Sequence, residues 1–481
     1  MKRELKKIKK GIIFLLVPVF LIGCFPKRDT TRDFQRLEFV ELEPIEVPEY
    51  TRRELKNGMI VYLMEDRTLP LIHFKALIKT GSIWDPQDKA GLCDITFEVI
   101  RTGGGGQRTG NEIDMKLERV GAQIEAGADR DMGWVCGFSL KDNFNEIFSV
   151  FGDILRNPLF DQAKIELAKI KIRGLIARRN DNIEELANRE FRRLIYGRDN
   201  PYARIVEYKT IEKITRNDLV LFYNNFFHPN NIVLGLWGDF ESEEMLKKVE
   251  SIFGDWEPRE IQFPEKPIIE QEPIASFNLV IRKEATQSAI RMGHLGIRRD
   301  HPDYFASIVL SKILGAGWHS RFGRRLRTEE GLAYEVWAWQ TAEFDYPGLF
   351  IATAQTSLGR TIEAITLMKR EIELIRQKEV SYEELKVGKE SILNAAVFWF
   401  DTKDEIIERL MRYEYYGYPL DYIKRLIEGI KEVTKNDILR VARAHLKPDK
   451  LTILVVGNPE FFDKPLSSLG EVRLLDISIP Q

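Results

Sequence analysis

Apolar residues recur along the chain with two different periods. Ala90–Arg101 and Gly110–Val120 carry apolar residues at the spacing of an amphipathic helix. Asp131–Leu140 alternates at every second position, as a half-buried strand does. Asn57-Gly58 lies between two apolar runs and predicts a hairpin with a type I′ turn. The other predicted strands are Tyr50–Leu55, Met59–Met64, Leu71–Lys79, Phe277–Arg282, Gln287–Gly296, Ala333–Glu343 and Leu349–Gln355, and the other predicted helical segments are Asn143–Leu155, Asp161–Leu194 (one or two helices), Tyr304–Leu314, Leu358–Lys378, Ser381–Phe400 and Thr402–Gly417.

One stretch of this pattern occurs twice, at Ile214–Gly238 and at Val433–Gly457. In both copies a threonine is followed three residues later by an aspartate, which predicts a capping box at the start of a helix. A proline, an apolar run typical of a buried strand and a glycine follow, all at the same offset of 219 residues. A pattern of this length at one fixed offset indicates a duplicated domain. The matched residues are Thr215 and Thr434, Asp218 and Asp437, Pro229 and Pro448, and Gly238 and Gly457.

The two copies close two lobes of similar plan. Strands and helices are mixed in each lobe without strict alternation, so we expect an α+β fold. Residues 257–276 carry four prolines among charged residues and predict a linker. We therefore expect one α+β domain over residues 51–256 and a second over residues 277–470, each of a size typical of one domain.

The N-terminus has the pattern of a targeting sequence. Six lysines and arginines precede the apolar segment Gly11–Ile22, which is too short to span a bilayer comfortably. The segment ends in Leu21-Ile-Gly-Cys24, which resembles a bacterial lipobox. This predicts a signal peptide over residues 1–23, a lipid on Cys24 and a tether over residues 24–50; an ordinary secretory signal or an uncleaved anchor is the alternative. Phe25 rather than aspartate follows the cysteine, so retention at the inner membrane is not signalled. In a bacterial cell envelope with two membranes, this favours the periplasmic face of the outer membrane.

The charge balance of the chain bears on the kind of partner that it can bind. Residues 1–23 hold six of the 72 Lys and Arg residues and one of the 74 Asp and Glu residues, so the chain from Cys24 onward has a net charge of −7. This balance argues against a nucleic-acid partner. An oxidising compartment permits a disulfide between Cys93 and Cys136, but their apolar surroundings favour two buried free thiols.

The second lobe contains a motif that runs from Leu314 to Tyr334. A glycine-rich turn is followed by Ser-Arg, then by Leu-Arg and finally by Gly-Leu-Ala-Tyr. In this order the motif resembles the pitrilysin/insulinase-type zinc peptidases, in the branch of mitochondrial processing peptidase and its bacterial two-subunit relatives. The resemblance covers about Glu54 to Pro459 and implies two homologous lobes that form half of a clam-shell. Asn157-Pro158-Leu-Phe160 and Phe227-His-Pro229 fit the same pattern.

The zinc motif of that family, H-x-x-E-H on a helix of the first lobe, is degenerate here. The prefix Gly91-Leu-Cys93 is present, but Asp94 and Glu98 stand where the two histidines belong. Phe97 stands where the family has the glutamate that activates the metal-bound water. The resemblance therefore implies that this chain alone is inactive and binds no zinc.

The sequence offers no clear alternative set of metal ligands. The third ligand of the family motif is expected near Gly174 or Leu175, and neither side chain can bind a metal. None of the six histidines has a His or Glu three or four residues away. Asp94 and Glu98, one helical turn apart, either hold a hard cation through oxygen or form a solvated acidic edge, and we favour the edge because two carboxylates rarely suffice.

Arg327 and Tyr334 match the positions that hold the substrate backbone in the family's active assemblies. A guanidinium and a phenol can both donate hydrogen bonds to a peptide carbonyl. Without the resemblance, a surface cation and a residue in a strand core would be the simpler interpretation. Gly315 and Gly317 predict a tight turn, and the resemblance adds a substrate-recognition role.

Three functions follow from these patterns. The leading hypothesis is a non-catalytic, substrate-binding subunit that supplies Arg327 and Tyr334 to a zinc-motif homologue, with zinc in the partner and an extended peptide as substrate. The alternative is a peptide-binding or scaffold lipoprotein with a peptidase fold and no proteolytic role. An independently active zinc peptidase is the third hypothesis, and the missing ligands disfavour it.

Overall fold

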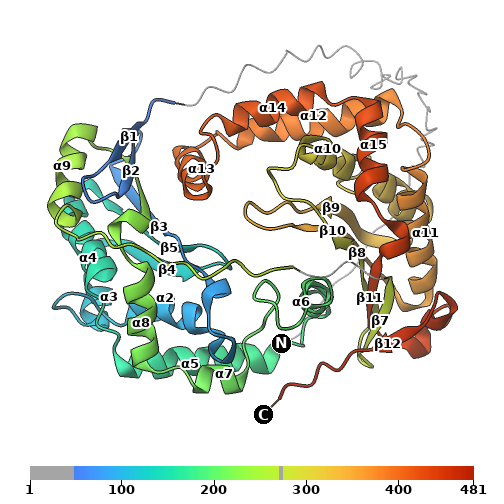
Figure 1. Cartoon of the computed structure of the whole chain (residues 1–481), viewed down its shortest axis with the longest axis horizontal. Coiled ribbons are helices and arrows are strands. Elements are labelled where there is room, and N and C mark those ends of the chain that lie inside the picture. The colour runs from blue at the N-terminus through green and yellow to red at the C-terminus, as the bar shows by residue number, and fades with distance from the viewer. Residues whose placement is uncertain (1–47, 270–274, 481) are drawn as a thin grey trace, which may run out of the picture. The chain divides into compact units, whose positions relative to one another are not determined.

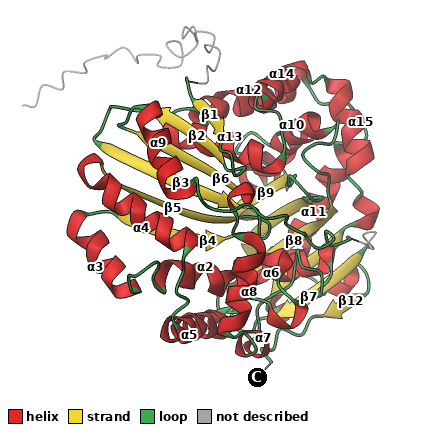
Figure 2. Cartoon of the chain, turned by 60° about the vertical axis from the view of Figure 1, so that its left-hand side comes forward, coloured by secondary structure: helices red, strands yellow, loops and turns green. Residues whose placement is uncertain are grey.

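The computed structural model describes residues 48–269 and 275–480, and these residues form one compact unit. Two six-stranded mixed sheets and their covering helices make up this unit, so the α+β prediction is confirmed (Figures 1 and 2). The predicted signal peptide, Cys24 and most of the tether lie outside the described residues. Within residues 48–269 and 275–480, no helix is both long and apolar enough to cross a membrane.

The first sheet has the strand order β1-β2-β6-β3-β5-β4. All neighbouring strands are antiparallel except β2 and β6, which are parallel. The strands are β1 (Thr51–Glu54), β2 (Ile60–Glu65), β3 (Leu71–Ile78), β4 (Gln123–Ala128), β5 (Gly133–Leu140) and β6 (Ile232–Gly238), and the α-helices of this half are α2 (Leu92–Thr102), α3 (Gly110–Val120), α4 (Phe144–Arg156), α5 (Gln162–Arg178), α6 (Ile183–Tyr196), α7 (Tyr208–Glu212), α8 (Arg216–Phe226) and α9 (Ser242–Phe253).

The second sheet repeats this topology in the order β12-β7-β11-β8-β10-β9. The five strands from β7 to β9 in this order correspond to the five strands from β2 to β4 in the first sheet. The edge strands differ, because β12 runs parallel to β7 whereas β1 runs antiparallel to β2. The strands are β7 (Ser276–Ile281), β8 (Gln287–Leu295), β9 (Ala333–Gln340), β10 (Leu349–Ser357), β11 (Thr452–Gly457) and β12 (Val472–Leu474), and the helices are α10 (Tyr304–Leu314), the π-helix η5 (Gly323–Glu329), α11 (Thr361–Leu374), α12 (Tyr382–Phe398), α13 (Lys403–Tyr416), α14 (Tyr422–Glu432) and α15 (Lys435–His445).

The repeated stretch forms the same unit in both halves. Thr215 and Asp218 make reciprocal hydrogen bonds at the start of α8, and Thr434 and Asp437 do so at the start of α15. The following strands, β6 and β11, are fully buried and lie inside their sheets. The predicted capping boxes and buried strands are therefore confirmed, and both copies place their strand between equivalent neighbours.

The predicted turn type of the first hairpin is wrong. Gly58 has φ 82°, but no other residue of the turn has a positive φ, whereas a type I′ turn requires two. The Gly58 N–H donates to Leu55 O and the Leu55 N–H donates to Met59 O, both at 2.9 Å, which closes a three-residue loop. Buried Asn57 uses its amide group to donate to Phe253 O at 2.7 Å, and this long-range contact fixes its conformation.

One helix of each lobe packs on the sheet of the other lobe. Helix α13 packs on β2 and β6 of the first sheet, on the side opposite α4 and α9 (Figure 1). Helix α6 packs on β8 and β11 of the second sheet. The two helices hold equivalent places in the duplication, because Lys403 at the start of α13 follows Ile183 at the start of α6 by 220 residues.

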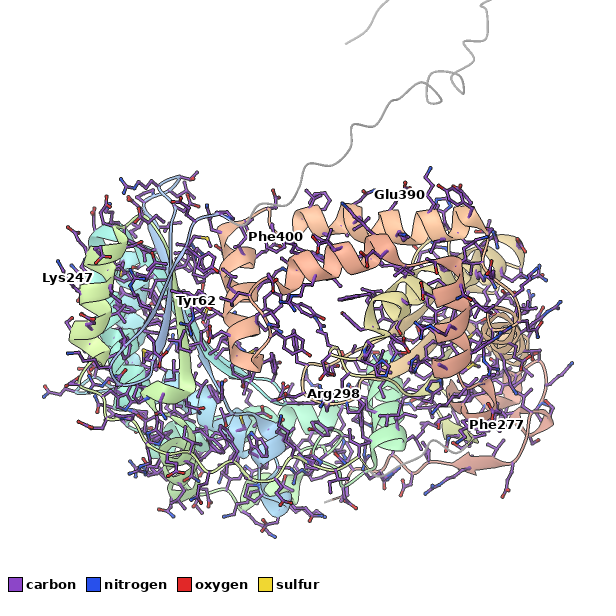
Figure 3. All side chains as sticks on the ribbon, turned by 45° about the horizontal axis from the view of Figure 1, so that its top comes forward. Tyr62, Lys247, Phe277, Arg298, Glu390 and Phe400 are labelled. Carbon is purple, nitrogen blue, oxygen red and sulfur yellow. The ribbon has the colours of Figure 1, made fainter. Side chains whose placement is uncertain are left out.

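Apolar side chains dominate both exchanged contacts. On α13, Ile407, Leu410 and Met411 are buried against Tyr62 and Val233 of the first sheet. Tyr62 is labelled in Figure 3. On α6, a matching row is buried against the second sheet and comprises Leu186, Ala187, Phe191 and Ile195. Each sheet therefore completes its core with a helix that the other half of the chain supplies.

Buried and half-buried polar groups add hydrogen bonds to these contacts. Glu414 on α13 accepts two hydrogen bonds from the Arg52 guanidinium, at 2.8 and 2.9 Å, and one from the Tyr62 hydroxyl at 2.6 Å. The hydrogen bonds from Arg52 lower the pKa of Glu414, so this carboxylate is charged at neutral pH. In the other contact, Arg291 on β8 is buried, pairs with Glu184 and donates to Asn188 Oδ1 at 2.7 Å.

Met411→Ala tests the exchanged contact of α13. The Met411 side chain fills space above Gly235 on β6, where an added Cβ would lie 2.3 Å from Met411 Sδ. We expect the variant to lose about 2–5 kcal/mol of unfolding free energy, as buried Met→Ala changes do. Urea unfolding measures this, with exposed Glu405→Ala on the same helix as the control. Equal stability of the two variants would contradict the packing role.

Asp131→Asn tests a half-buried carboxyl group next to α13. Asp131 accepts a hydrogen bond from the Tyr416 hydroxyl at 3.1 Å, and burial raises the pKa of Asp131 to about 6. The folded-state pKa exceeds the unfolded value of about 3.9, so the stabilising effect of its proton is complete below about pH 4. That effect is lost as the pH rises through about 6.

Asparagine keeps the shape and one acceptor oxygen but does not titrate. We therefore expect the Tm of Asp131→Asn, relative to the unsubstituted chain, to be more favourable at about pH 7.5 than at about pH 5. Thermal unfolding at both pH values measures the difference, with Asp142→Asn at an exposed position as the control. A pH-independent difference would show that Asp131 is not protonated preferentially in the folded chain.

Candidate functional site

The start of helix α2 is held by a buried carboxylate. Asp85 accepts hydrogen bonds from Gly91 N at 2.8 Å and from Cys93 N at 2.9 Å. Gly91 has φ 100°, a left-handed conformation that glycine adopts without strain. Burial raises the pKa of Asp85 to about 7. These contacts fix the first turn of α2, which contains Asp94, and Phe97 and Glu98 follow in the next turn of the same helix.

Asp94 and Glu98 line one pocket of about 390 Å³ between α2 and α5. Leu175, one of the two positions where the family's third ligand is expected, lines the same pocket together with Ile172. The Asp94 carboxylate has no hydrogen bond or ion pair with any described residue. The pocket walls desolvate it and raise its pKa to about 6, although the residue is exposed at the pocket mouth.

A lysine ammonium group neutralises the other carboxylate. Lys171 on α5 lies 3.1 Å from both carboxylate oxygens of Glu98. The charged groups that line the pocket are Asp94, Glu98, Lys171 and Arg179, and the rest of its lining is aliphatic. The pocket therefore offers no imidazole or thiolate of the kind that holds catalytic zinc. The residues present therefore do not fit the zinc of the H-x-x-E-H motif.

Phe97 does not face this pocket. Its side chain is fully buried, its ring centroid lies 5.4 Å from that of Phe227, and it fills the space over Gly133 on β5. The position where the family has its catalytic base is therefore part of the hydrophobic core in this chain. Cys93, beside it in sequence, is a buried free thiol, and Cys136 is a half-buried one.

One other group has the composition of a metal site. His301, Asp303 and His445 are the only three metal-binding side chains of the described residues whose ligand atoms lie within 4.8 Å of one another. These donors are already engaged: Asp303 accepts from His445 Nε2 at 2.7 Å and from Arg440 at 2.6 Å, and His301 Nδ1 accepts from Asp303 N at 3.0 Å. The Arg440 cation and these mutual contacts favour a polar link between α10 and α15 over a metal site.

Phe97→Glu tests whether the base can simply be restored. The substitution removes buried aromatic packing and places a carboxyl in the apolar core, so we expect a loss of at least about 3 kcal/mol of unfolding free energy. Glu98→His changes a half-buried residue at the pocket and serves as the control. Denaturant unfolding compares the two variants. A Phe97→Glu variant as stable as Glu98→His would contradict the core assignment.

The structure brings Arg327 and Tyr334 together in the second lobe. The Arg327 guanidinium carbon lies 4.7 Å from the centroid of the Tyr334 ring. Trp318, to which no family motif assigns a role, lies still closer, with its ring centroid 3.5 Å from the same carbon. Tyr334 is 81% exposed and Trp318 is 64% exposed, so the three side chains form a surface cluster.

Two local irregularities present these side chains. Arg327 lies in the π-helix η5. π-Helical turns are rare in proteins and occur frequently at functional sites. Tyr334 lies at a β-bulge near the start of β9, because Ala333 pairs with Thr356 and Glu335 pairs with Gln355 while Tyr334 has no partner. The extra residue of a bulge re-aims its side chain, which accounts for the exposure of Tyr334.

The glycine-rich turn is held rigidly at the base of the cluster. Gly315 leaves no room for a side chain, because an added Cβ would lie 2.1 Å from Ala338 N on β9. Gly317 has φ 113° and open space around it, so its glycine serves the backbone conformation. Ser320 donates to Gly317 O at 2.6 Å, and Arg321 pairs with Glu384 of α12 at 2.7 Å. The structure thus gives Gly315 a packing role, and Gly317 leads directly into Trp318.

Comparison with known proteins places this arrangement in a family. Residues 65–208 match the family model described as Insulinase (Peptidase family M16), and residues 213–392 match the one described as Peptidase M16 inactive domain.

The chain belongs to the M16 (insulinase) peptidase family.

Similar M16 proteins carry names of both active and inactive type. A Helicobacter pylori protein named non-peptidase homolog YmxG is 22% identical over 416 residues, which cover 85% of this chain and 94% of that protein. A Bacillus subtilis protein named uncharacterized zinc protease YmxG is 23% identical over 343 residues, covering 70% of this chain and 82% of that protein. The beta subunit of the Saccharomyces cerevisiae mitochondrial-processing peptidase is 20% identical over 376 residues, which cover 73% of this chain and 79% of that protein.

Solved structures share the fold. The peptidase M16 inactive domain from Pseudomonas fluorescens superimposes with a TM-score of 0.78 at 24% identity and covers 87% of this chain and all of that one. A structure described as a protease from Helicobacter pylori has a TM-score of 0.74 at 17% identity and covers 85% of this chain. At these identities the likeness establishes the fold, and the chemistry must be argued from the site residues.

Proposed function

We propose that this chain is the non-catalytic, substrate-binding subunit of a heteromeric zinc metallopeptidase of the bacterial cell envelope. The observation that carries the proposal is a contrast between the two halves. The zinc position of the first half is filled by Asp94, a Glu98–Lys171 ion pair and a core phenylalanine. The second half presents Arg327 and Tyr334 together at its surface.

The second-half cluster suits an extended peptide. The Arg327 side chain makes no hydrogen bond or ion pair with the described residues, so its N–H groups remain available to an oxygen acceptor. Tyr334 stands at the start of β9, which is the last strand of its sheet. An edge strand can pair with an added peptide strand, and this would bring the peptide backbone past Tyr334 and Arg327.

The reaction itself would take place on zinc held by a partner chain with the H-x-x-E-H motif. In that assembly Arg327 and Tyr334 would donate hydrogen bonds to the carbonyl oxygens of the substrate and position its backbone at the partner's metal. A relative named as a subunit of a processing peptidase, together with one named as a non-peptidase homolog, supports this division of labour. A lipid on Cys24 would hold the complex at the periplasmic face of the outer membrane.

Arg327→Ala and Tyr334→Phe test the proposal in a reconstituted pair with a zinc-motif homologue from the same cell. Loss of a donor to developing negative charge lowers kcat/KM by about 100-fold, which we expect for Arg327→Ala. Loss of one hydroxyl hydrogen bond lowers it by about tenfold, which we expect for Tyr334→Phe. Arg324→Ala, exposed on the same helical segment, is the control. Peptide cleavage is followed by mass spectrometry.

Two outcomes would overturn the proposal. One is peptide cleavage by this chain alone with one zinc ion per chain, which would make it an independent peptidase. The other is an unchanged rate in the pair after both substitutions, which would favour a scaffold role without proteolysis.

A further inference from the structure

Trp318 has an unusual environment for a large apolar side chain. It is 64% exposed, while most tryptophans bury the greater part of their surface. Its ring lies over the Arg327 guanidinium with 3.5 Å between the ring centroid and the guanidinium carbon. This is the shortest of the cation–ring separations among the described residues, so the contact is a specific feature of the surface.

The backbone beneath Trp318 is fixed. Gly317, immediately before it, has φ 113° and its carbonyl accepts the Ser320 hydroxyl at 2.6 Å. Ser320 in turn accepts a hydrogen bond from Gly323 N at 3.0 Å at the start of η5. The turn that carries Trp318 and the helix that carries Arg327 are therefore tied together, and the indole and the guanidinium are aligned by the backbone.

The stacking leaves the binding capacity of Arg327 intact. An aromatic ring attracts a cation through its face and consumes none of the N–H donors. Two rings close to one guanidinium group restrict its rotamers, so less conformational entropy is lost when a ligand binds. The exposed part of the indole also offers an apolar surface beside the bound carbonyl.

We infer that Trp318 is a third member of the substrate-binding site, which positions the Arg327 guanidinium and contacts an apolar or aromatic side chain of the bound peptide. The inference rests on the proposed function insofar as the ligand is a peptide. It assigns Trp318 two separable effects: one on Arg327 in the free chain, and one on the preference for the peptide residue adjacent to the carbonyl that Arg327 binds.

The positioning effect is measured on the full chain without any ligand. The Nε–H proton of Arg327 is assigned in a nitrogen-15 NMR spectrum by its loss in Arg327→Lys. The ring current of Trp318 should shift this resonance upfield. We expect Trp318→Ala to abolish that part of the shift and Trp318→Phe to retain some of it. Tyr382→Ala, an exposed aromatic residue on α12, should leave the resonance unchanged.

The selectivity effect is measured by fluorescence anisotropy with three labelled, unstructured peptides of about 12 residues. They are identical except for Phe, Leu or Ser at the central position. We expect the Phe and Leu peptides to bind about fivefold more tightly than the Ser peptide, a ratio that falls to about one in Trp318→Ala. Arg327→Ala should weaken all three peptides alike, and the melting temperature of each variant confirms folding.

The outcomes separate this inference from the proposed function. An Arg327 resonance that is unchanged in Trp318→Ala overturns the positioning effect. A Phe-to-Ser binding ratio that persists in Trp318→Ala overturns the contact. If no peptide binds the unsubstituted chain at all, the peptide-binding part of the proposed function fails, and the assignment of Trp318 to a peptide site fails with it, whatever the NMR result.

Discussion

The exchange of α6 and α13 between the two sheets is the constraint on which the rest of the molecule depends. Each sheet has one face covered by helices of its own half and the other face covered by a helix from the other half. Removing either helix would expose a buried apolar surface, so neither sheet has a complete core without the other. The two halves therefore form a single cooperative structure although each carries its own copy of the duplicated plan.

The same exchange positions both parts of the candidate site. Helix α5, which places Lys171 and Leu175 opposite α2, continues directly into the exchanged helix α6. Helix α12, whose Glu384 anchors Arg321 in the glycine-rich motif, continues into the exchanged helix α13. Equivalent helix pairs thus support the degenerate zinc motif in one half and the Arg327 cluster in the other. The two halves share one framework and differ in the side chains that they place on it.

Much of the architecture could be predicted from the sequence because it rests on local patterns. The repeat with its capping boxes and buried strands is one example, and the helices Gly110–Val120 and Tyr304–Leu314 have the predicted bounds.

Strands β4 and β12 are absent from the prediction, because β4 is largely half-buried or exposed and β12 has only three residues. Helices α9 and α14 were not predicted either, although both have helical apolar spacing. The dipeptide Asn57-Gly58 predicts a type I′ turn, but the hydrogen bond from Asn57 to the distant Phe253 O overrides this local preference.

What could not be predicted depends on contacts between residues far apart in sequence. A helical apolar face shows that α6 and α13 are buried but not which sheet covers them. The degenerate motif identified Asp94, Phe97 and Glu98, but only the fold shows that Phe97 faces the core while Lys171 pairs with Glu98. Trp318 carried a usable signal, since it follows the glycine-rich turn directly, but its stacking on Arg327 is visible only in three dimensions.

The central claim is that this chain works beside a zinc-bearing partner. The most direct measurement is isolation of the full-length chain from the membranes of its own cell, with mass spectrometry of the proteins that co-purify and metal analysis of the complex. We expect a stoichiometric homologue that carries an intact H-x-x-E-H motif and the bound zinc. A chain that is recovered without any zinc-motif homologue would contradict it.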